Sequence, residues 1–116
     1  MRKFLGLFLL FFSVNIFATA NYSPWAAPTR IDVMRHQGLV VYGSFGNSAG
    51  CTVSDAVYLP IGLTQYKEIY SLLLTAIAQG KEVSIYTSTC TTLLWFSASA
   101  TYNTVSGDDL TVNIRD

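Results

Sequence analysis

The chain has one histidine and two cysteines, and only 12% of its 116 residues are charged. With His36 as the single imidazole, every metal site that needs two histidine ligands is excluded. Seven lysines and arginines balance seven aspartates and glutamates, so no basic surface is expected for nucleic acid or an acidic membrane. Apolar residues reach 51%, which is typical of a folded protein. We therefore predict a small neutral domain without a metal, a cofactor or a nucleic-acid partner.

The longest apolar run lies at the N-terminus. Arg2 and Lys3 precede a stretch from Phe4 to Phe17, and the small residues of Ala18-Thr19-Ala20 suit a signal peptidase. A membrane anchor is the alternative. The stretch is about 14 residues long, whereas roughly 20 are needed to span a bilayer, so a cleaved signal is favoured.

The predicted signal peptide spans residues 1–20, with cleavage between Ala20 and Asn21. The rest of the chain, residues 21–116, is long enough for a single domain. None of its segments is long and apolar enough to cross a bilayer, so no membrane span is expected after cleavage. We expect the protein to be secreted or periplasmic.

The two cysteines, Cys51 and Cys90, both follow the predicted signal. In an exported protein such a pair is most simply a disulfide, and small exported domains often need one. Free or intermolecular thiols and a catalytic pair are the alternatives. A disulfide closing a loop of about 40 residues would stabilise the fold by roughly 3–4 kcal/mol in the chain-entropy model.

Residues 64–79 have the clearest local pattern in the sequence, that of a helix. Thr64 is the predicted N-cap, and Gly80 is expected just past the end of the helix. One apolar stripe recurs at helical spacing, formed by Tyr66, Ile69, Tyr70, Leu73 and Ile77.

Alternating apolar and polar residues predict strands on both sides of this helix. The expected strands before it are 30–36, 39–45 and 51–58, with a turn around Gln37-Gly38. Those after it are 83–90, 93–102 and 110–114. Residues 21–28 are expected to lie along the surface or at a sheet edge. The fold class is α+β, a small antiparallel OB-like barrel or a curled sheet of five to six strands with one central helix.

Few groups in the sequence are able to support catalysis. His36 lies near a predicted turn, where a surface histidine is the commoner interpretation. Asp108 and Asp109 follow Gly107, and acids are favoured in such turns for conformational reasons. We therefore predict no catalytic residue and no enzyme.

Aromatic rings and short polar side chains are the remaining chemistry. Rings pack against the C–H faces of sugars, while Ser, Thr and Asn groups bond to sugar hydroxyls. Packing in the core or at an edge is the alternative role for each ring. The candidate rings are Tyr22, Trp25, Tyr86, Trp95 and Tyr102.

The segment from Cys51 to Cys90 carries a set of local features in a particular order. Leu59-Pro60 follows the first cysteine, Tyr66-Lys67-Glu68 begins the helix, and Gln79-Gly80 leads to a strand with Val83 and Ile85. In these features the chain resembles the receptor-binding B subunits of the subtilase-cytotoxin and typhoid-toxin group and related small exported bacterial proteins. The resemblance implies an OB-like fold, a ring of identical subunits, recognition of sialylated or other glycans on host cells, and an A subunit as partner.

In the toxin members a serine near the mature N-terminus, after a tyrosine pair, contacts the sugar. The corresponding segment here, Tyr22-Ser23-Pro24-Trp25 through Thr29, has no matching motif. The candidate glycan-binding residues are accordingly Tyr22, Trp25, Thr29 and Tyr86. The predicted function is an exported, non-enzymatic module that binds carbohydrate. The alternative is an exported protein-interaction or assembly domain without a small ligand.

Overall fold

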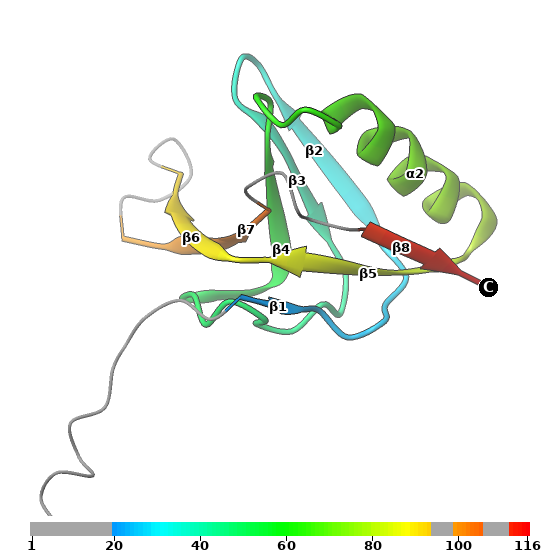
Figure 1. Ribbon diagram of the computed structural model, residues 1–116, viewed down its shortest axis with the longest axis horizontal. Coiled ribbons are helices and arrows are strands. Elements are labelled where there is room, and N and C mark those ends of the chain that lie inside the picture. The colour runs from blue at the N-terminus through cyan, green and yellow to red at the C-terminus, as the bar shows by residue number, and fades with distance from the viewer. Residues whose placement is uncertain (1–19, 94–98, 106–111) are drawn as a thin grey trace, which may run out of the picture.

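The structure is a computed structural model that describes residues 20–93, 99–105 and 112–116. These residues form eight strands and one helix (Figure 1). The elements are β1 (Asn21–Tyr22), β2 (Arg30–Met34), β3 (Gly38–Tyr42), β4 (Val53–Pro60), α2 (Tyr66–Gln79), β5 (Glu82–Thr87), β6 (Thr89–Thr92), β7 (Thr101–Thr104) and β8 (Val112–Arg115). The predicted α+β class is confirmed.

The strands form two open sheets. One has three strands in the order β1-β5-β8, and the other has five in the order β2-β3-β4-β7-β6. All pairs are antiparallel except β4 with β7, which run parallel. The expectation of one antiparallel sheet was therefore wrong in the number of sheets and in this pairing, although the larger sheet has five strands, within the predicted range. Periodicity within a strand does not indicate which strand will be its neighbour.

One run of chain takes part in both sheets. β5 belongs to the three-stranded sheet, and after Ser88 the chain continues as β6 into the five-stranded sheet (Figure 1). This run matches the strand predicted over 83–90. The N-terminal segment lies along β5, as expected, through β1 and through a bridge between Ala26 and Val83.

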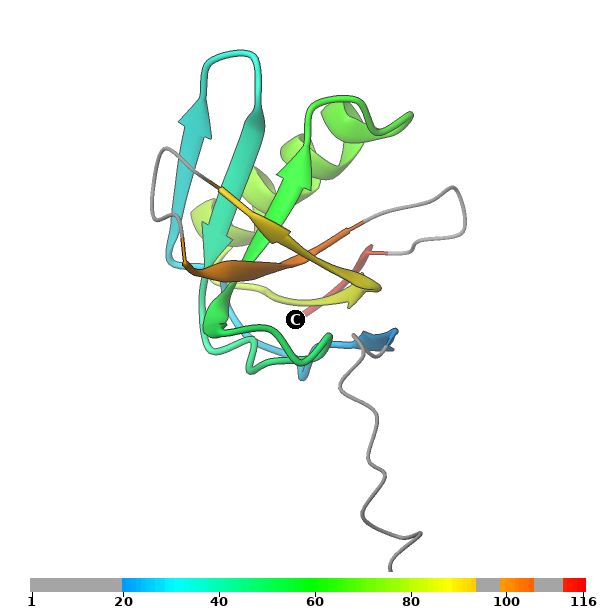
Figure 2. The ribbon, with the colours of Figure 1, turned by 90° about the vertical axis from the view of Figure 1, so that its left-hand side faces the viewer.

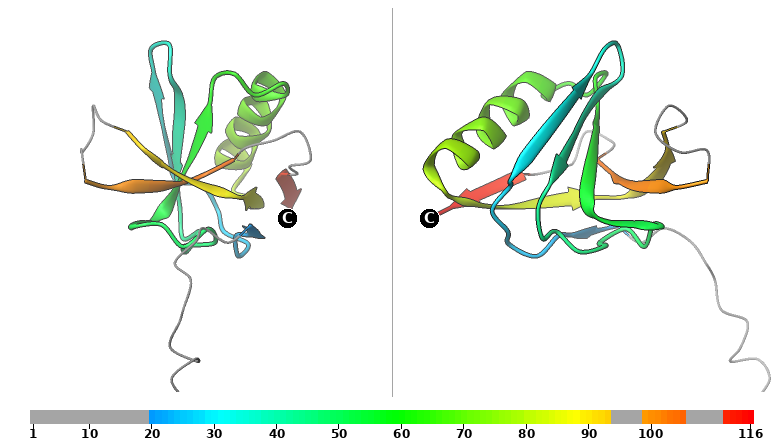
Figure 3. Two further views of the ribbon diagram at one scale, coloured as in Figure 1. Left: turned by 60° about the vertical axis from the view of Figure 1, so that its left-hand side comes forward. Right: turned by 180° about the vertical axis from the view of Figure 1, so that it is seen from behind.

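The strands β3 and β4 are buried on both faces. One face, with Leu39, Val41 and Leu59, packs against α2 and β5, while the other face, with Val40 and Tyr58, packs against residues of β7 and the end of β6. Figure 2 shows β6 and β7 crossing β3 and β4, and Figure 3 shows α2 on the other side of these strands. The strands β3 and β4 therefore separate two apolar clusters.

The helix α2 ends as predicted but begins differently. Gly80 adopts a left-handed conformation (φ 66°), and its N–H donates to the carbonyl of Ala76. The expected N-cap at Thr64 was wrong, because Gln65 is the capping residue and no side chain bonds to the first turn. Ile69, Leu73 and Ala76 are buried, so the predicted apolar stripe does face the core.

Two places between strands were harder to predict from the sequence pattern, the β2–β3 turn and the segment before β7. At the β2–β3 turn, a Cβ on Gly38 (φ +139°) would lie 2.0 Å from the carbonyl oxygen of Leu59, so only glycine fits. The long strand predicted over 93–102 was wrong. Leu93, Ser99 and Ala100 belong to no strand, and β7 begins only at Thr101, which pairs with Thr92 of β6. Residues 94–98 of the predicted strand lie outside the described residues.

Candidate functional site

The three-stranded sheet has one face in the core and one face toward solvent. Val83 and Ile85 of β5 are fully buried. Because side chains alternate along a strand, Glu82, Ser84 and Tyr86 point to the opposite side. We call this side, together with the residues of β1 and β8 that share it, the outer face.

Two tyrosine rings meet at one end of the outer face. Tyr22 of β1 pairs with Tyr86 of β5, and the ring centroids are 5.1 Å apart with an interplanar angle of 63°. This edge-to-face arrangement is favourable for aromatic rings. Tyr22 is 43% exposed and Tyr86 is half-buried, so the pair offers a ring surface to solvent.

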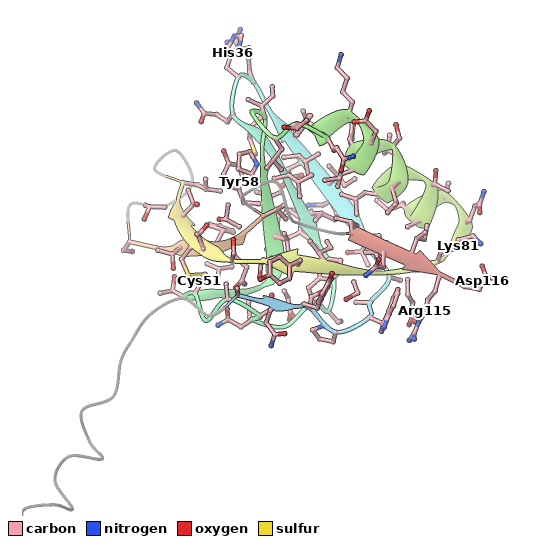
Figure 4. All side chains as sticks on the ribbon, viewed as in Figure 1. His36, Cys51, Tyr58, Lys81, Arg115 and Asp116 are labelled. Atoms are coloured by element: carbon pink, nitrogen blue, oxygen red, sulfur yellow. A yellow bond between two sulfur atoms is a disulfide. The ribbon has the colours of Figure 1, made fainter. Side chains whose placement is uncertain are left out.

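The third ring of the outer face is stacked on a cation at the other end. The guanidinium carbon of Arg115 lies 4.3 Å from the centroid of Trp25. Arg115 is paired with Glu82 across β8 and β5, and its Nε and Nη2 lie 3.0 and 2.9 Å from one carboxylate oxygen of Glu82. Figure 4 shows Arg115 near the C-terminal end of the chain.

Between the two ends, the N-terminal segment is fastened to β5 by Ser23. Its backbone N–H donates to the carbonyl of Ile85, and its hydroxyl accepts from the N–H of Ile85. The hydroxyl of Ser84 donates to the carbonyl of Ser23 at 2.7 Å. β5 lies between β1 and β8, and on β8 the half-buried Asn113 pairs with Ser84. Its amide therefore belongs to the outer face between the rings.

The structure brings together three of the four predicted glycan-binding residues. Thr29 is the exception, because its N–H and hydroxyl both donate to the carbonyl of Tyr42 near the start of β2. Of the other candidate rings, Tyr102 is buried in the core cluster between β3–β4 and β7. Trp95 lies outside the described residues, as do Asp108 and Asp109.

The predicted cleavage point falls at the beginning of the described chain. Ala20 is exposed, and Asn21 begins β1 beside Thr87.

The two cysteines form the predicted disulfide. Cys51 and Cys90 have Cα atoms 5.5 Å apart and connect the end of the β3–β4 loop to β6. The same loop is held by buried Asn103, whose amide oxygen accepts from the N–H of Ala49 and whose amide nitrogen donates to the carbonyl of Val53. Ser48 is bonded to Thr87 at the end of β5. These contacts fix the loop against the run of chain that carries Tyr86.

His36 lies at the tip of the β2–β3 hairpin, away from Arg115 (Figure 4). It occupies the left-handed region (φ 63°), which histidine tolerates better than most residues. The left-handed conformation of this turn therefore accounts for a histidine at this position.

A pocket of about 390 Å³ lies between the end of β4 and the start of α2. Its lining includes Ile61, Leu63 and Tyr66, and none of the predicted site residues. Burial raises the pKa of the Tyr66 hydroxyl, and the nearby Tyr70 and Tyr58 act in the same direction. The pocket is therefore separate from the outer face.

Sequence reasoning missed Glu82, Asn113 and Arg115. The alternation in 112–115 indicates that Asn113 and Arg115 share one side of a strand. It does not indicate that this strand pairs with β5, and that pairing is what places both residues beside the rings.

No protein-family model, curated protein or solved structure matches this chain. Within the described ranges, no helix has the length and hydropathy needed to cross a membrane. In the same part of the chain, no three His, Cys, Asp or Glu side chains gather in a way that could hold a metal ion.

Proposed function

We propose that the protein is an exported, non-enzymatic module that binds carbohydrate through the outer face. The observation that supports this most is that Tyr22, Tyr86, Trp25 and Asn113 share the outer face of one sheet. The rings provide flat apolar surfaces for the C–H faces of sugars. The amide offers both donors and an acceptor to sugar hydroxyls.

The framework behind these residues supports binding without rearrangement. Ser23 fixes the N-terminal segment to β5 by two hydrogen bonds, and Arg115 holds the Trp25 ring from one side. A site held in its binding conformation loses less entropy when a ligand arrives.

The strand order supports the proposed OB-like architecture. The strands of the larger sheet can be numbered one to five along the chain as β2, β3, β4, the run β5–β6, and β7. Their order in the sheet is then 1-2-3-5-4. The third and fifth, β4 and β7, are parallel. This is a Greek-key order like that of the partly open OB barrel, a fold used for oligosaccharides and oligonucleotides. This strand order agrees with the resemblance to toxin B subunits. On the basis of that resemblance, host glycans and an A subunit are the proposed partners.

Exposed apolar side chains favour a second candidate, an exported assembly domain that forms homo-oligomers. Val33 on the edge strand β2 is 58% exposed, Ile61 is 51% exposed, and Leu74 on α2 is 47% exposed. Contacts between copies would cover these groups. Light scattering of the wild type and of the variants Val33→Thr and Leu74→Ser tests this candidate. It fails if the wild type is a monomer at high micromolar concentration.

A glycan array probed with the oxidised protein tests the carbohydrate proposal. We expect binding that is lost in the double variant Tyr22→Ala/Tyr86→Ala and retained in Arg35→Ala, which changes an exposed residue of the β2–β3 turn remote from the outer face. Absence of binding on a broad array of neutral and acidic glycans would overturn the proposal.

A further inference from the structure

The charges on the outer face neutralise one another. Glu82 holds the guanidinium of Arg115 through two N–H groups, and the same guanidinium is stacked on Trp25. Just before the start of β5, Lys81 is paired with Asp116. Each cation near the rings therefore has its own carboxylate.

No other cationic side chain after residue 20 is available to this face. Every Lys and Arg after residue 20 lies in the described ranges, and Arg30 is paired with Asp32 on β2. Arg35 is in the β2–β3 turn and Lys67 is on α2. A carboxylate or sulfate bound among the rings would have to share Arg115 with Glu82, and it would then lie near the negative charge of Glu82.

The face is also longer than one sugar ring. Tyr86 and Glu82 are four residues apart on β5, which corresponds to roughly 13 Å along a strand. The Tyr22–Tyr86 pair lies at one end and Trp25 beside Arg115 at the other, with the Asn113 amide between them. This spacing suits an extended oligosaccharide that contacts a ring at each end.

We propose that the outer face takes uncharged oligosaccharides and rejects acidic ones, and that Glu82 determines this specificity by occupying Arg115. The inference rests on the proposed carbohydrate function. Glu82 disfavours acidic sugars in two ways, because it neutralises the only nearby guanidinium and because its own charge repels an anion. With Glu82 in place, the ligand is bound by rings and amide alone.

The test compares the affinity for a neutral oligosaccharide with that for the same oligosaccharide bearing a terminal uronic or sialic acid. We expect the wild type to bind the neutral form at least about tenfold more tightly, a difference of ~1.4 kcal/mol. Glu82→Gln frees Arg115, so we expect it to gain at least about tenfold in affinity for the acidic form while neutral binding changes little. Asp32→Asn is the matched control, since it frees Arg30 on the other sheet and should leave both affinities unchanged.

The outcomes separate the inference from the function on which it rests. Equal or tighter binding of the acidic form by the wild type overturns the inference and leaves the carbohydrate function standing. An unchanged preference in folded Glu82→Gln overturns the role of Glu82. No binding of either form overturns both. If Glu82→Gln does not fold, the wild-type preference alone still decides between neutral and acidic ligands.

Discussion

The two sheets differ in how their strands are held. In the five-stranded sheet, β3 and β4 have apolar residues buried on both faces, and the disulfide and Asn103 fasten the adjoining loop. In the three-stranded sheet, only one face is buried, and the other carries rings, an amide and an ion pair. The comparison suggests that stability resides mainly in the first sheet, while the second presents an exposed surface at little cost to the fold.

The largest expected effect is in the core beneath the larger sheet. Leu73 of α2 is fully buried, so Leu73→Ala should lower the free energy of unfolding by ~2–5 kcal/mol through lost burial and a cavity. Urea denaturation measures the change. Its neighbour Leu74 is 47% exposed, and Leu74→Ala should cost less than about 1 kcal/mol. Equal costs for the two variants would show that α2 is packed differently.

The next largest effect is expected from the disulfide. Replacing Cys51 and Cys90 together by serine should lower the free energy of unfolding by roughly 3–4 kcal/mol, because the unfolded chain regains the entropy of an open loop. Urea denaturation of the oxidised, the reduced and the doubly substituted protein measures this. An unchanged midpoint on reduction would show that Asn103 and Ser48 hold the loop without the disulfide.

A smaller effect on stability, with a larger effect on binding, is expected on the outer face. Trp25→Ala should weaken glycan binding at least about tenfold and change the free energy of unfolding by less than about 1 kcal/mol. Tyr42→Ala is the matched control, since Arg30 lies 4.2 Å from its ring centroid on the other sheet. Calorimetric titration gives the affinities. Equal loss of binding in both variants would contradict a site on the outer face.

The smallest effect concerns alkaline pH. Burial raises the pKa of Tyr58 above its ordinary value of 10.0. The neutral phenol is therefore favoured in the folded state, and this contribution to stability is complete below about pH 10 and lost as the pH rises through the folded pKa. Tyr58→Phe should reduce the fall in the urea midpoint as the pH rises above about 10. At neutral pH the same variant loses only the hydrogen bond to the carbonyl of Gln37, about 1 kcal/mol. An unchanged slope would assign the alkaline sensitivity to other groups.

The sequence was most informative where structure depends on near neighbours. Helix 66–79 was predicted as 64–79, because apolar spacing and Gly80 act within a few residues. The disulfide followed from composition and export. The parallel pairing of β4 with β7 could not be predicted, since it depends on contacts far apart in the chain. For the same reason Tyr22, Trp25 and Tyr86 were chosen as residue types suited to sugars, while Glu82 and Arg115 became visible only with the β5–β8 pairing.

The chain run from β5 through Ser88 to β6 limits how this protein can change. Tyr86 must face outward two positions before Ser88, and Cys90 must meet Cys51 two positions after it. An inserted or deleted residue at Ser88 would reverse the orientation of one segment relative to the other, since strand side chains alternate with a period of two. Mutation can therefore vary the side chains of the outer face freely, whereas the length of this connection has to stay constant.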